Sequence, residues 1–310
     1  MKNIVIGTRG SRLALVQAGL VKEALERSFT DLAVTLKEIK TTGDVITDIP
    51  LEKIGDKGVF IKELEAALLE AEIDLAVHSM KDMPTLLPPG LKIGAMLERE
   101  EPWDVFISTI RGGKLSGLGK GARIGSSSLR RRAQLLHRYP HLEICSVRGN
   151  VDTRLKKLER GDFEGIILAY AGVKRMGWSD LIDEIIPADI CLPSVGQGAI
   201  GLEIRSGDAE TEALVQALHC SRTGTAVEAE RAFLRRLEGG CQVPIGALAA
   251  VRKGNLSLQG MVASLDGKLM FKGEKKGLPE DAQALGTALA EELLQDGCGS
   301  ILDQIRQECE

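Results

Sequence analysis

The sequence predicts an α/β protein with two similar, mostly parallel-sheet lobes and a small α+β domain at the carboxyl end. Apolar runs of strand length alternate with segments of helical apolar spacing up to about residue 218. A polar segment that ends in proline, residues 98–102, interrupts this alternation once. From residue 247, three short strand-like segments follow one another without a helix between them, which is typical of an antiparallel sheet.

The first lobe is expected to run from residue 1 to about residue 98. A short buried strand at 3–6 is followed by a turn rich in Gly and Arg and then by an amphipathic helix. Further on, a strand, a helix and a third strand are predicted at 32–40, 60–71 and 73–78, and the third strand ends in Ser79-Met80-Lys81-Asp82. Because strands alternate with helices, we expect a mostly parallel sheet covered on both faces.

The second lobe, residues 102–193, repeats this pattern. Its predicted strands are 123–125, 142–147 and 165–169, and each is followed by a helix. Ser126-Ser127-Ser128 stands between the first strand and its helix, and Arg148-Gly149-Asn150 stands between the second strand and its helix. The two lobes are therefore expected to share one architecture.

The remaining chain is divided between the first lobe and a third domain. A strand at 199–204 and a helix at 208–218 are assigned to the first lobe, by analogy with two-lobed binding folds in which the chain crosses back. A helix at 227–237, three strands and a helix at 281–294 form the α+β domain. The predicted domains are 1–98 with 199–218, 102–193, and 222–310.

The composition is that of a globular protein and excludes several classes. Hydrophobic residues make up 44% and charged residues 27% of the chain. No apolar run is long enough for a signal peptide core or a membrane span, so we expect a cytoplasmic protein with no membrane partner. The six cysteines contain no C-x-x-C pair and are expected to be reduced. Pro140 separates His137 from His141, so no metal motif is left.

Positive charge is concentrated in the middle of an acidic protein. The net charge is −4. Residues 120–175 nevertheless contain 13 Lys or Arg against 5 Asp or Glu, a local balance of +8. This distribution indicates one localised anion site rather than a generally basic surface.

Three turns between a strand and a helix carry arginine together with Gly or Ser: residues 8–12, 126–132 and 148–154. Helix N-terminal amides bind anions, and Arg adds a bidentate donor suited to carboxylate or phosphate. No nucleotide-binding glycine loop is present, so many separate arginines favour a ligand with many carboxylates. Any single arginine could be a solvated surface charge. The set that favours an anion-binding cleft is Arg9, Arg130, Arg131, Arg148, Arg154 and Arg175.

Two further residues could carry chemistry. Asp82 follows a predicted buried strand, where a carboxylate facing arginines could act as an acid or base or stabilise a developing cation. An ordinary turn aspartate is the alternative. Cys241 stands in Leu237-Glu238-Gly239-Gly240-Cys241-Gln242-Val243-Pro244, where the glycines would let a large group approach the thiol. A buried packing cysteine is the alternative there.

Six motifs occur in an order that resembles the porphobilinogen deaminase (hydroxymethylbilane synthase) family. The match spans nearly the whole chain, and the ordered set is far more specific than any one motif. The motifs are Gly7-Thr8-Arg9 to Ser11, His78-Ser79-Met80-Lys81-Asp82, Gly125-Ser126-Ser127-Ser128-Leu129-Arg130-Arg131, Arg148-Gly149-Asn150, Leu192-Pro193 to Gly198, and Leu237 to Pro244. The resemblance also implies lobes similar to type-2 periplasmic binding proteins.

The resemblance implies a transferase of tetrapyrrole (haem) biosynthesis with a dipyrromethane cofactor, built from the enzyme's own substrate and attached covalently to the thiol of Cys241. Four porphobilinogen molecules would be condensed head to tail on this primer, each losing ammonia, and water would release hydroxymethylbilane. Asp82 would assist departure of the aminomethyl nitrogen and hold the pyrrole N–H groups while an azafulvene-like cation forms. Lys81 and His78 would support its placement.

The resemblance assigns the remaining positions to binding the carboxylates and pyrroles of cofactor and substrate. Ser126 stands where some family members have threonine, which keeps the hydroxyl, and no role is assigned to Arg132. The cofactor-binding residues would be Cys241, Asp82, Lys57, Ser126, Ser127, Ser128, Arg130, Arg131, Arg148 and Gly149. The substrate-binding residues would be Arg9, Ser11, Arg148, Arg154, Arg175 and Gln197.

The expected partner is porphobilinogen, and the chain is expected to be a monomer. A non-catalytic two-lobed carboxylate-binding protein is a second interpretation, although it leaves Cys241 unexplained. A nucleic-acid binder is a third, with strongly salt-dependent affinity. Two observations count against a nucleic-acid binder: aromatic residues make up only 3% of the chain, and the basic charge is confined to one stretch. No nucleic-acid partner is therefore expected.

Overall fold

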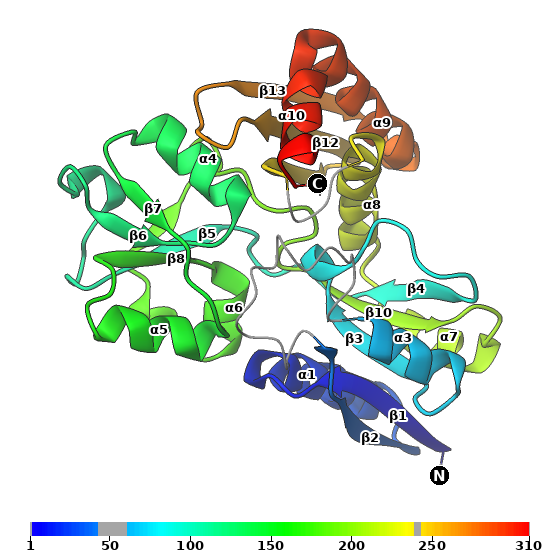
Figure 1. Ribbon diagram of the computed structural model, residues 1–310. Coiled ribbons are helices and arrows are strands. Elements are labelled where there is room, and N and C mark those ends of the chain that lie inside the picture. Colours follow the sequence, from blue (N-terminus) through cyan, green and yellow to red (C-terminus); the bar gives the residue numbers. More distant parts are fainter. Residues whose placement is uncertain (1, 43–60, 239–242, 310) are drawn as a thin grey trace. The chain divides into compact units, whose positions relative to one another are not determined.

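The computed structural model describes residues 2–42, 61–238 and 243–309 (Figure 1). The chain divides into two compact units, which we call the first unit (residues 1–100 and 199–224) and the second unit (residues 101–198 and 225–310). Among the described residues there are two five-stranded sheets and one three-stranded sheet. The predicted α/β class, with two parallel-rich sheets and a C-terminal antiparallel sheet, is confirmed.

The first unit holds a sheet with the strand order β2-β1-β3-β10-β4. Its strands are β1 (Lys2–Arg9), β2 (Leu32–Ile39), β3 (Leu75–Ser79), β4 (Leu91–Met96) and β10 (Ile200–Arg205). β1 is parallel to β2 and β3, whereas β10 is antiparallel to both β3 and β4. In Figure 1 the yellow-green β10 lies between the cyan β3 and β4, so a late segment of the chain completes an early sheet.

Helices cover both faces of this sheet because its strands alternate apolar side chains between the two faces. Ile4 and Ile6 of β1 pack in one cluster with Val21 and Leu25 of α1, while Val5 packs on the opposite side in a cluster with α3. The helices of this unit are α1 (Arg12–Ser28), α3 (Lys62–Leu69) and α7 (Ala209–Gln216). The α3 face also receives the even-numbered residues of β3, Ala76 and His78.

The second unit repeats this topology in the order β7-β6-β8-β5-β9. Its strands are β5 (Asp104–Ser108), β6 (Arg123–Gly125), β7 (Glu143–Cys145), β8 (Gly165–Ala169) and β9 (Glu184–Ile186). β6 is parallel to β7 and β8, and β5 is antiparallel to β8 and β9. Its helices are α4 (Leu129–Arg138), α5 (Val151–Glu159) and α6 (Tyr170–Arg175). The strand that opposes the others therefore has the same place in both sheets.

The second unit also contains the antiparallel sheet β11-β12-β13. Its strands are β11 (Ile245–Arg252), β12 (Asn255–Ala263) and β13 (Met270–Gly277). The helices that accompany it in sequence are α8 (Ser221–Arg236, which begins in the first unit), α9 (Ala282–Leu293) and α10 (Gly299–Cys309). Phe233 of α8 and Leu289 of α9 share one apolar cluster with Leu258 of β12, so these helices and the sheet enclose a common core.

Short helical turns complete the described chain. They are η2 (Met80–Asp82), η3 (Leu115–Gly117), η4 (Ser179–Leu181), η5 (Pro279–Asp281) and the π-helical η6 (Leu294–Cys298). Of these, η2 follows β3 directly and carries Asp82, one of the predicted site residues.

Packing joins the antiparallel sheet to α4. Ala133 of α4 lies in one apolar cluster with Met261 and Ala263 of β12, and Nδ1 of His137 lies 2.8 Å from the carbonyl oxygen of Gly267. These contacts explain why the sheet and the second lobe form one compact unit. The division into three domains stays a prediction.

Several elements were not predicted from the sequence. β4, β5, β9 and α10 were missed, and β1 extends through Arg9, which shortens the predicted turn to residues 10–11. β9 is as short as β6, but no helix follows it before β10, so it lacks the strand-turn-helix pattern that marked β6. β5 begins with a charged residue, Asp104. Among the helices of the described ranges, none has the length and apolar character needed to cross a membrane.

Candidate active site

A pocket in the first unit lies at the carboxyl ends of β1 and β3. Its polar lining includes Arg9, Ser11, Gln17, Ser79 and Asp82. β1 and β3 are parallel neighbours, so their carboxyl ends meet at the same edge of the sheet, where open α/β sheets bind ligands. The structure thus brings together three residues that the sequence analysis proposed, Arg9, Ser11 and Asp82.

Local hydrogen bonds hold the walls of this pocket. Ser11 caps α1, and its hydroxyl accepts a hydrogen bond from the backbone N–H of Ala14 at 3.4 Å. The Gln17 amide is buried, and its Nε2 donates to the hydroxyl of Ser79 at 3.0 Å. Gln17 was missed, and its position on the apolar side of a predicted helix was the available signal.

Asp82 is the last residue of η2, directly after β3. Its side chain is exposed, and that of Lys81 is half-buried. The turn is closed by a hydrogen bond from the backbone N–H of Met83 to the carbonyl of Met80, at 3.3 Å. An exposed carboxylate in one pocket with Arg9 can therefore meet a ligand that carries both a cation and carboxylates.

In the second unit, the serine turn after β6 is tied to the turn after β7. The Ser127 hydroxyl donates to the carbonyl of Val147 at 2.6 Å and accepts from its N–H at 3.0 Å. Ser128 caps α4 and accepts from the N–H of Arg131. Ser126 is buried. The two predicted anion-binding turns, at Ser126 and Arg148, consequently lie side by side.

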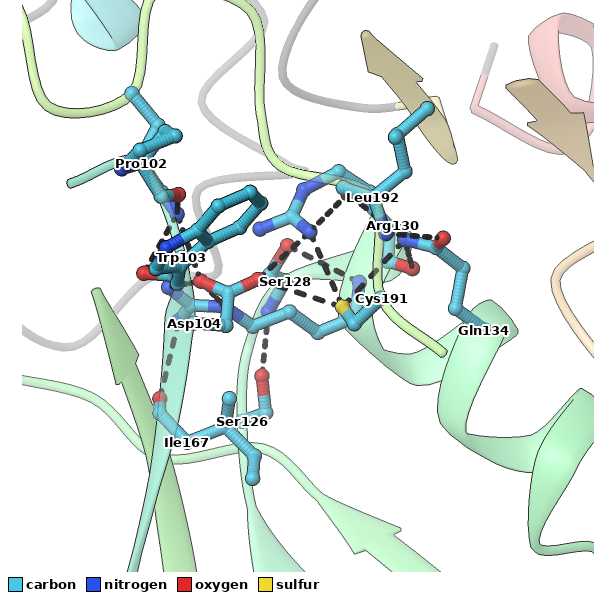
Figure 2. Close-up of polar contacts among 12 residues, drawn as sticks. Pro102, Trp103, Asp104, Ser126, Ser128, Arg130, Gln134, Ile167, Cys191 and Leu192 are labelled. Atoms are coloured by element: carbon cyan, nitrogen blue, oxygen red, sulfur yellow. Dashed lines mark hydrogen bonds and ion pairs between the residues drawn. The ribbon is translucent and has the colours of Figure 1, made fainter. Parts of the chain in front are cut away.

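Arg130 and Arg131 are buried and share one carboxylate, that of Asp104 at the start of β5. Oδ2 of Asp104 lies 2.8 Å from Nη1 of Arg130, and Oδ1 lies 2.7 Å from Nη2 of Arg131. Figure 2 shows the Asp104 carboxylate directed toward the side chains of Arg130 and Cys191. The sequence analysis missed Asp104 because it missed β5.

The Asp104 carboxylate is ionised. Burial by itself raises the pKa of Asp104, but the charges and hydrogen bonds of Arg130 and Arg131 outweigh it and hold the pKa well below the ordinary value. Two guanidinium groups against one carboxylate leave a buried excess of one positive charge. In the described part of the chain, Nε of Arg130 has no hydrogen-bond partner. The pair can therefore still attract an anion.

Gln197 belongs to the same network. It is buried, and its Nε2 donates to the carbonyl of Pro102 at 2.6 Å and to Oδ1 of Asp104 at 2.9 Å. These contacts join the start of β5 to the segment before β10. They give Gln197 a positional role in addition to the substrate contact that the sequence analysis expected.

Two further arginines of the proposed site, Arg154 and Arg175, donate to backbone carbonyls of the second unit. Nε of Arg154 donates to the carbonyl of Gly149 at 2.8 Å, and Nη2 of Arg175 donates to that of Gly198 at 2.6 Å. Gly149 has φ +101°, and a Cβ there would lie 2.6 Å from the side chain of Thr153. Glycine is therefore required at this turn, beside Arg148.

Two of the proposed site residues, Lys57 and Cys241, lie outside the described residues. The flanks of Cys241 are described: α8 ends at Arg236 and β11 begins at Ile245. The helix and the strand that the sequence predicted on either side of Cys241 are therefore present. Arg132 is exposed on α4, and nothing in the structure gives it a role.

Two family models match the chain. The porphobilinogen deaminase dipyrromethane cofactor binding domain matches residues 4–213, and the porphobilinogen deaminase C-terminal domain matches residues 225–295. The chain belongs to the porphobilinogen deaminase family. The family that the six sequence motifs predicted is thereby confirmed, together with the dipyrromethane cofactor that this family binds.

Curated relatives share the family name over nearly their full length. The porphobilinogen deaminase of Carboxydothermus hydrogenoformans is 54% identical over 99% of this chain and 98% of its own. That of Desulforudis audaxviator is 52% identical over 98% of each chain. Among solved structures, a TRAP periplasmic solute binding protein from Desulfovibrio salexigens is 10% identical, with a TM-score of 0.43 over 70% of this chain and 72% of its own. The fold class rests on the strand pairing, not on that partial likeness.

The described residues fit the family's cofactor. A dipyrromethane carries carboxylates, and the Arg130–Arg131–Asp104 cluster has an excess positive charge with an unpartnered Nε on Arg130 within the described chain. The adjacent serine and glycine turns add hydroxyl and backbone donors. The donor set is thus suited to carboxylates. Among the described residues, no group of three His, Cys, Asp or Glu could hold a metal ion.

Proposed function

We propose that this protein condenses four porphobilinogen molecules head to tail on a dipyrromethane primer attached to Cys241, and releases hydroxymethylbilane. The observation that carries the proposal is the exposed Asp82 carboxylate in one pocket with Arg9, within a chain whose residues 4–213 match the family's cofactor-binding domain. A carboxylate stabilises a cation, and a guanidinium binds a carboxylate. Porphobilinogen carries carboxylates and forms a cation during the reaction, so it requires both kinds of partner.

Each condensation breaks one bond and makes another. The C–N bond of the aminomethyl group breaks and ammonia leaves, which generates a cation on the pyrrole methylene carbon. A C–C bond then forms between this carbon and the free α-carbon of the preceding pyrrole, which loses its proton. In our proposal Asp82 stabilises the cation and accepts hydrogen bonds from the pyrrole N–H groups. Lys81 supports the placement of Asp82. Water adds to the methylene carbon of the first substrate ring when the tetrapyrrole is released.

Two sets of residues are proposed to hold the anionic groups. Ser126, Ser127, Ser128, Arg130, Arg131, Arg148, Gly149 and Lys57 would hold the cofactor, together with Asp82 and the thioether at Cys241. Arg9, Ser11, Arg148, Arg154, Arg175 and Gln197 would bind the substrate. When bound, the cofactor supplies the free pyrrole carbon to which the first substrate is joined.

We also propose a monomer that works in the cytoplasm without a nucleic-acid partner. Four cysteines of the described chain, Cys145, Cys191, Cys220 and Cys298, are free, which fits a reducing compartment. The low aromatic content gives little support for base stacking. Light scattering at several protein concentrations would test the monomer.

Incubation of the purified protein with porphobilinogen tests the proposed reaction. We expect four molecules of ammonia for each hydroxymethylbilane, which cyclises without further enzyme to a porphyrinogen and oxidises to a coloured porphyrin. A carboxylate-binding protein without catalysis would bind porphobilinogen but release no ammonia. Binding without ammonia release would therefore reject the proposed function and favour that second interpretation.

A further inference from the structure

A buried pair of ionisable groups lies on the α3 face of the first sheet, next to the segment that carries Asp82. Nε2 of His78 lies 2.9 Å from Oε2 of Glu203, and the two side chains are 5% and 0% exposed. His78 is the fourth residue of β3, and Glu203 comes from β10. His78 is paired directly with Gly201 in the sheet. Glu203, two residues further along β10, is therefore the diagonal neighbour of His78, and its long side chain can reach the imidazole.

Met80, the first residue of η2, makes two further contacts, one with Ala199 just before β10 and one with Gly201 within β10. The backbone N–H of Met80 donates to the carbonyl of Ala199 at 3.0 Å. Met80 also packs against Gly201 so closely that a Cβ there would lie 2.2 Å from its sulfur. Residues 199–205 therefore hold the start of η2 by a backbone hydrogen bond, by close packing and by the His78–Glu203 contact.

The His78–Glu203 pair is expected to contribute little to the stability of the fold. Burying two ionisable groups carries a desolvation cost that their attraction often fails to exceed. Oε1 of Glu203 has no hydrogen-bond partner in the described chain, which adds to that cost. Glu65 of α3 also faces the cluster, where burial and then the charge of Glu203 raise its pKa, against smaller opposing effects of His78 and Lys62. Two apolar side chains at these positions would avoid this desolvation free energy.

We propose that Glu203 is a positioning residue for the condensation reaction. By fixing the imidazole of His78, it sets the position of η2 and thereby of the Asp82 carboxylate. The inference rests on the proposed function. It concerns the placement of a reacting group, so it predicts a change in kcat rather than in substrate binding or cofactor attachment.

The test compares the wild-type holoenzyme with Glu203→Gln, which keeps the side-chain shape and removes the charge. We expect kcat to fall about ten-fold or more with KM within about two-fold, and the covalent adduct to be retained in the intact mass. Asp183→Asn is the matched control. The Asp183 carboxylate, in the second unit, is 2% exposed and accepts backbone hydrogen bonds from Ser108 and Gly112, each at 2.8 Å. Its substitution should lower stability and leave kcat unchanged.

A double-substitution cycle separates positioning from a merely structural role. If Glu203 acts through His78, then Glu203→Gln with His78→Asn should lose no more kcat than the worse single variant. Additive losses would overturn the proposal. A wild-type kcat in folded Glu203→Gln would overturn it as well, whereas an inactive wild type would instead reject the proposed function.

Gly201→Ala provides a second variant should Glu203→Gln fail to fold. It keeps every charge and places a methyl group 2.2 Å from the sulfur of Met80, so that the Met80 side chain or the backbone of η2 must shift. We expect a lower kcat with the adduct retained. A crystal structure of the variant that shows η2 displaced, together with an unchanged kcat, would overturn the proposal, because the position of η2 would then not control the reaction.

Discussion

Asp104 binds Arg131 side-on: Oδ1 accepts hydrogen bonds from Nε at 3.0 Å and from Nη2 at 2.7 Å. Arg131 stands in the first turn of α4, where a cation is unfavourable beside the helix dipole. Both side chains are buried. A single carboxylate on β5 therefore holds in place an arginine that helix formation alone would not favour.

Asp104→Asn should destabilise the protein by about 3–5 kcal/mol, because it leaves two buried guanidinium groups without a carboxylate. The free energy of unfolding in guanidinium chloride measures the loss. Asp162→Asn is the control, since Asp162 pairs with Arg160 at the surface and should contribute under about 1 kcal/mol. Equal effects of the two substitutions would contradict this account of the cluster.

The stabilisation by Asp104 should depend on pH. Because the folded pKa lies below the ordinary value of 3.8, the contribution is present above about pH 4 and is lost as the pH falls further. The difference in unfolding free energy between wild type and Asp104→Asn should thus be constant from about pH 5 to 7 and shrink below about pH 4. If the difference in unfolding free energy instead grew as the pH fell, the proposed stabilisation by ionised Asp104 would be contradicted.

Asp82→Asn should keep the fold and the attached cofactor but lose nearly all turnover, because the amide cannot neutralise the developing cation. Ammonia release and the intact mass measure the two properties separately. Asp303→Asn, at an exposed carboxylate on α10, should have wild-type activity. Turnover of Asp82→Asn close to wild type would remove Asp82 from the proposed mechanism.

Cys241→Ser should lose the covalent adduct, since the serine hydroxyl is a much weaker nucleophile than a thiolate. The wild-type intact mass should exceed the sequence mass by a dipyrromethane. Cys145→Ser should retain that adduct. An unmodified wild-type mass, together with turnover, would refute the primer role of Cys241.

Cys191 should resist thiol reagents in the folded protein. Burial, followed by the charge of Asp104, raises the pKa of Cys191 to about 12, so almost no thiolate is present at about pH 8. Peptide mapping after brief treatment with a maleimide should find Cys145 labelled before Cys191. Equal labelling of the two native thiols would mean that the Asp104 cluster opens on that timescale.

The sequence predicted the elements that carry a clear period. The helix after Ser128 and the strand at 165–169 were found because their apolar spacing is strong and local. β9 was missed because it is short and, unlike β6, is not followed by a helix. β5 was missed because its first residue, Asp104, is charged and is not expected to be buried. Because β5 was missed, Asp104 was not recognised as the ion-pair partner of Arg130 and Arg131.

The sequence by itself determined the family, through the ordered motifs, and the residue types of the site, because arginine turns and a carboxylate after a strand are local patterns. Only the tertiary structure decided which of those charges are paired. Asp104 meets Arg131 across 27 positions of the chain, and His78 meets Glu203 across 125. Such partners depend on strand order, since β5 and β10 enter their sheets from distant segments, and no local pattern encodes that order.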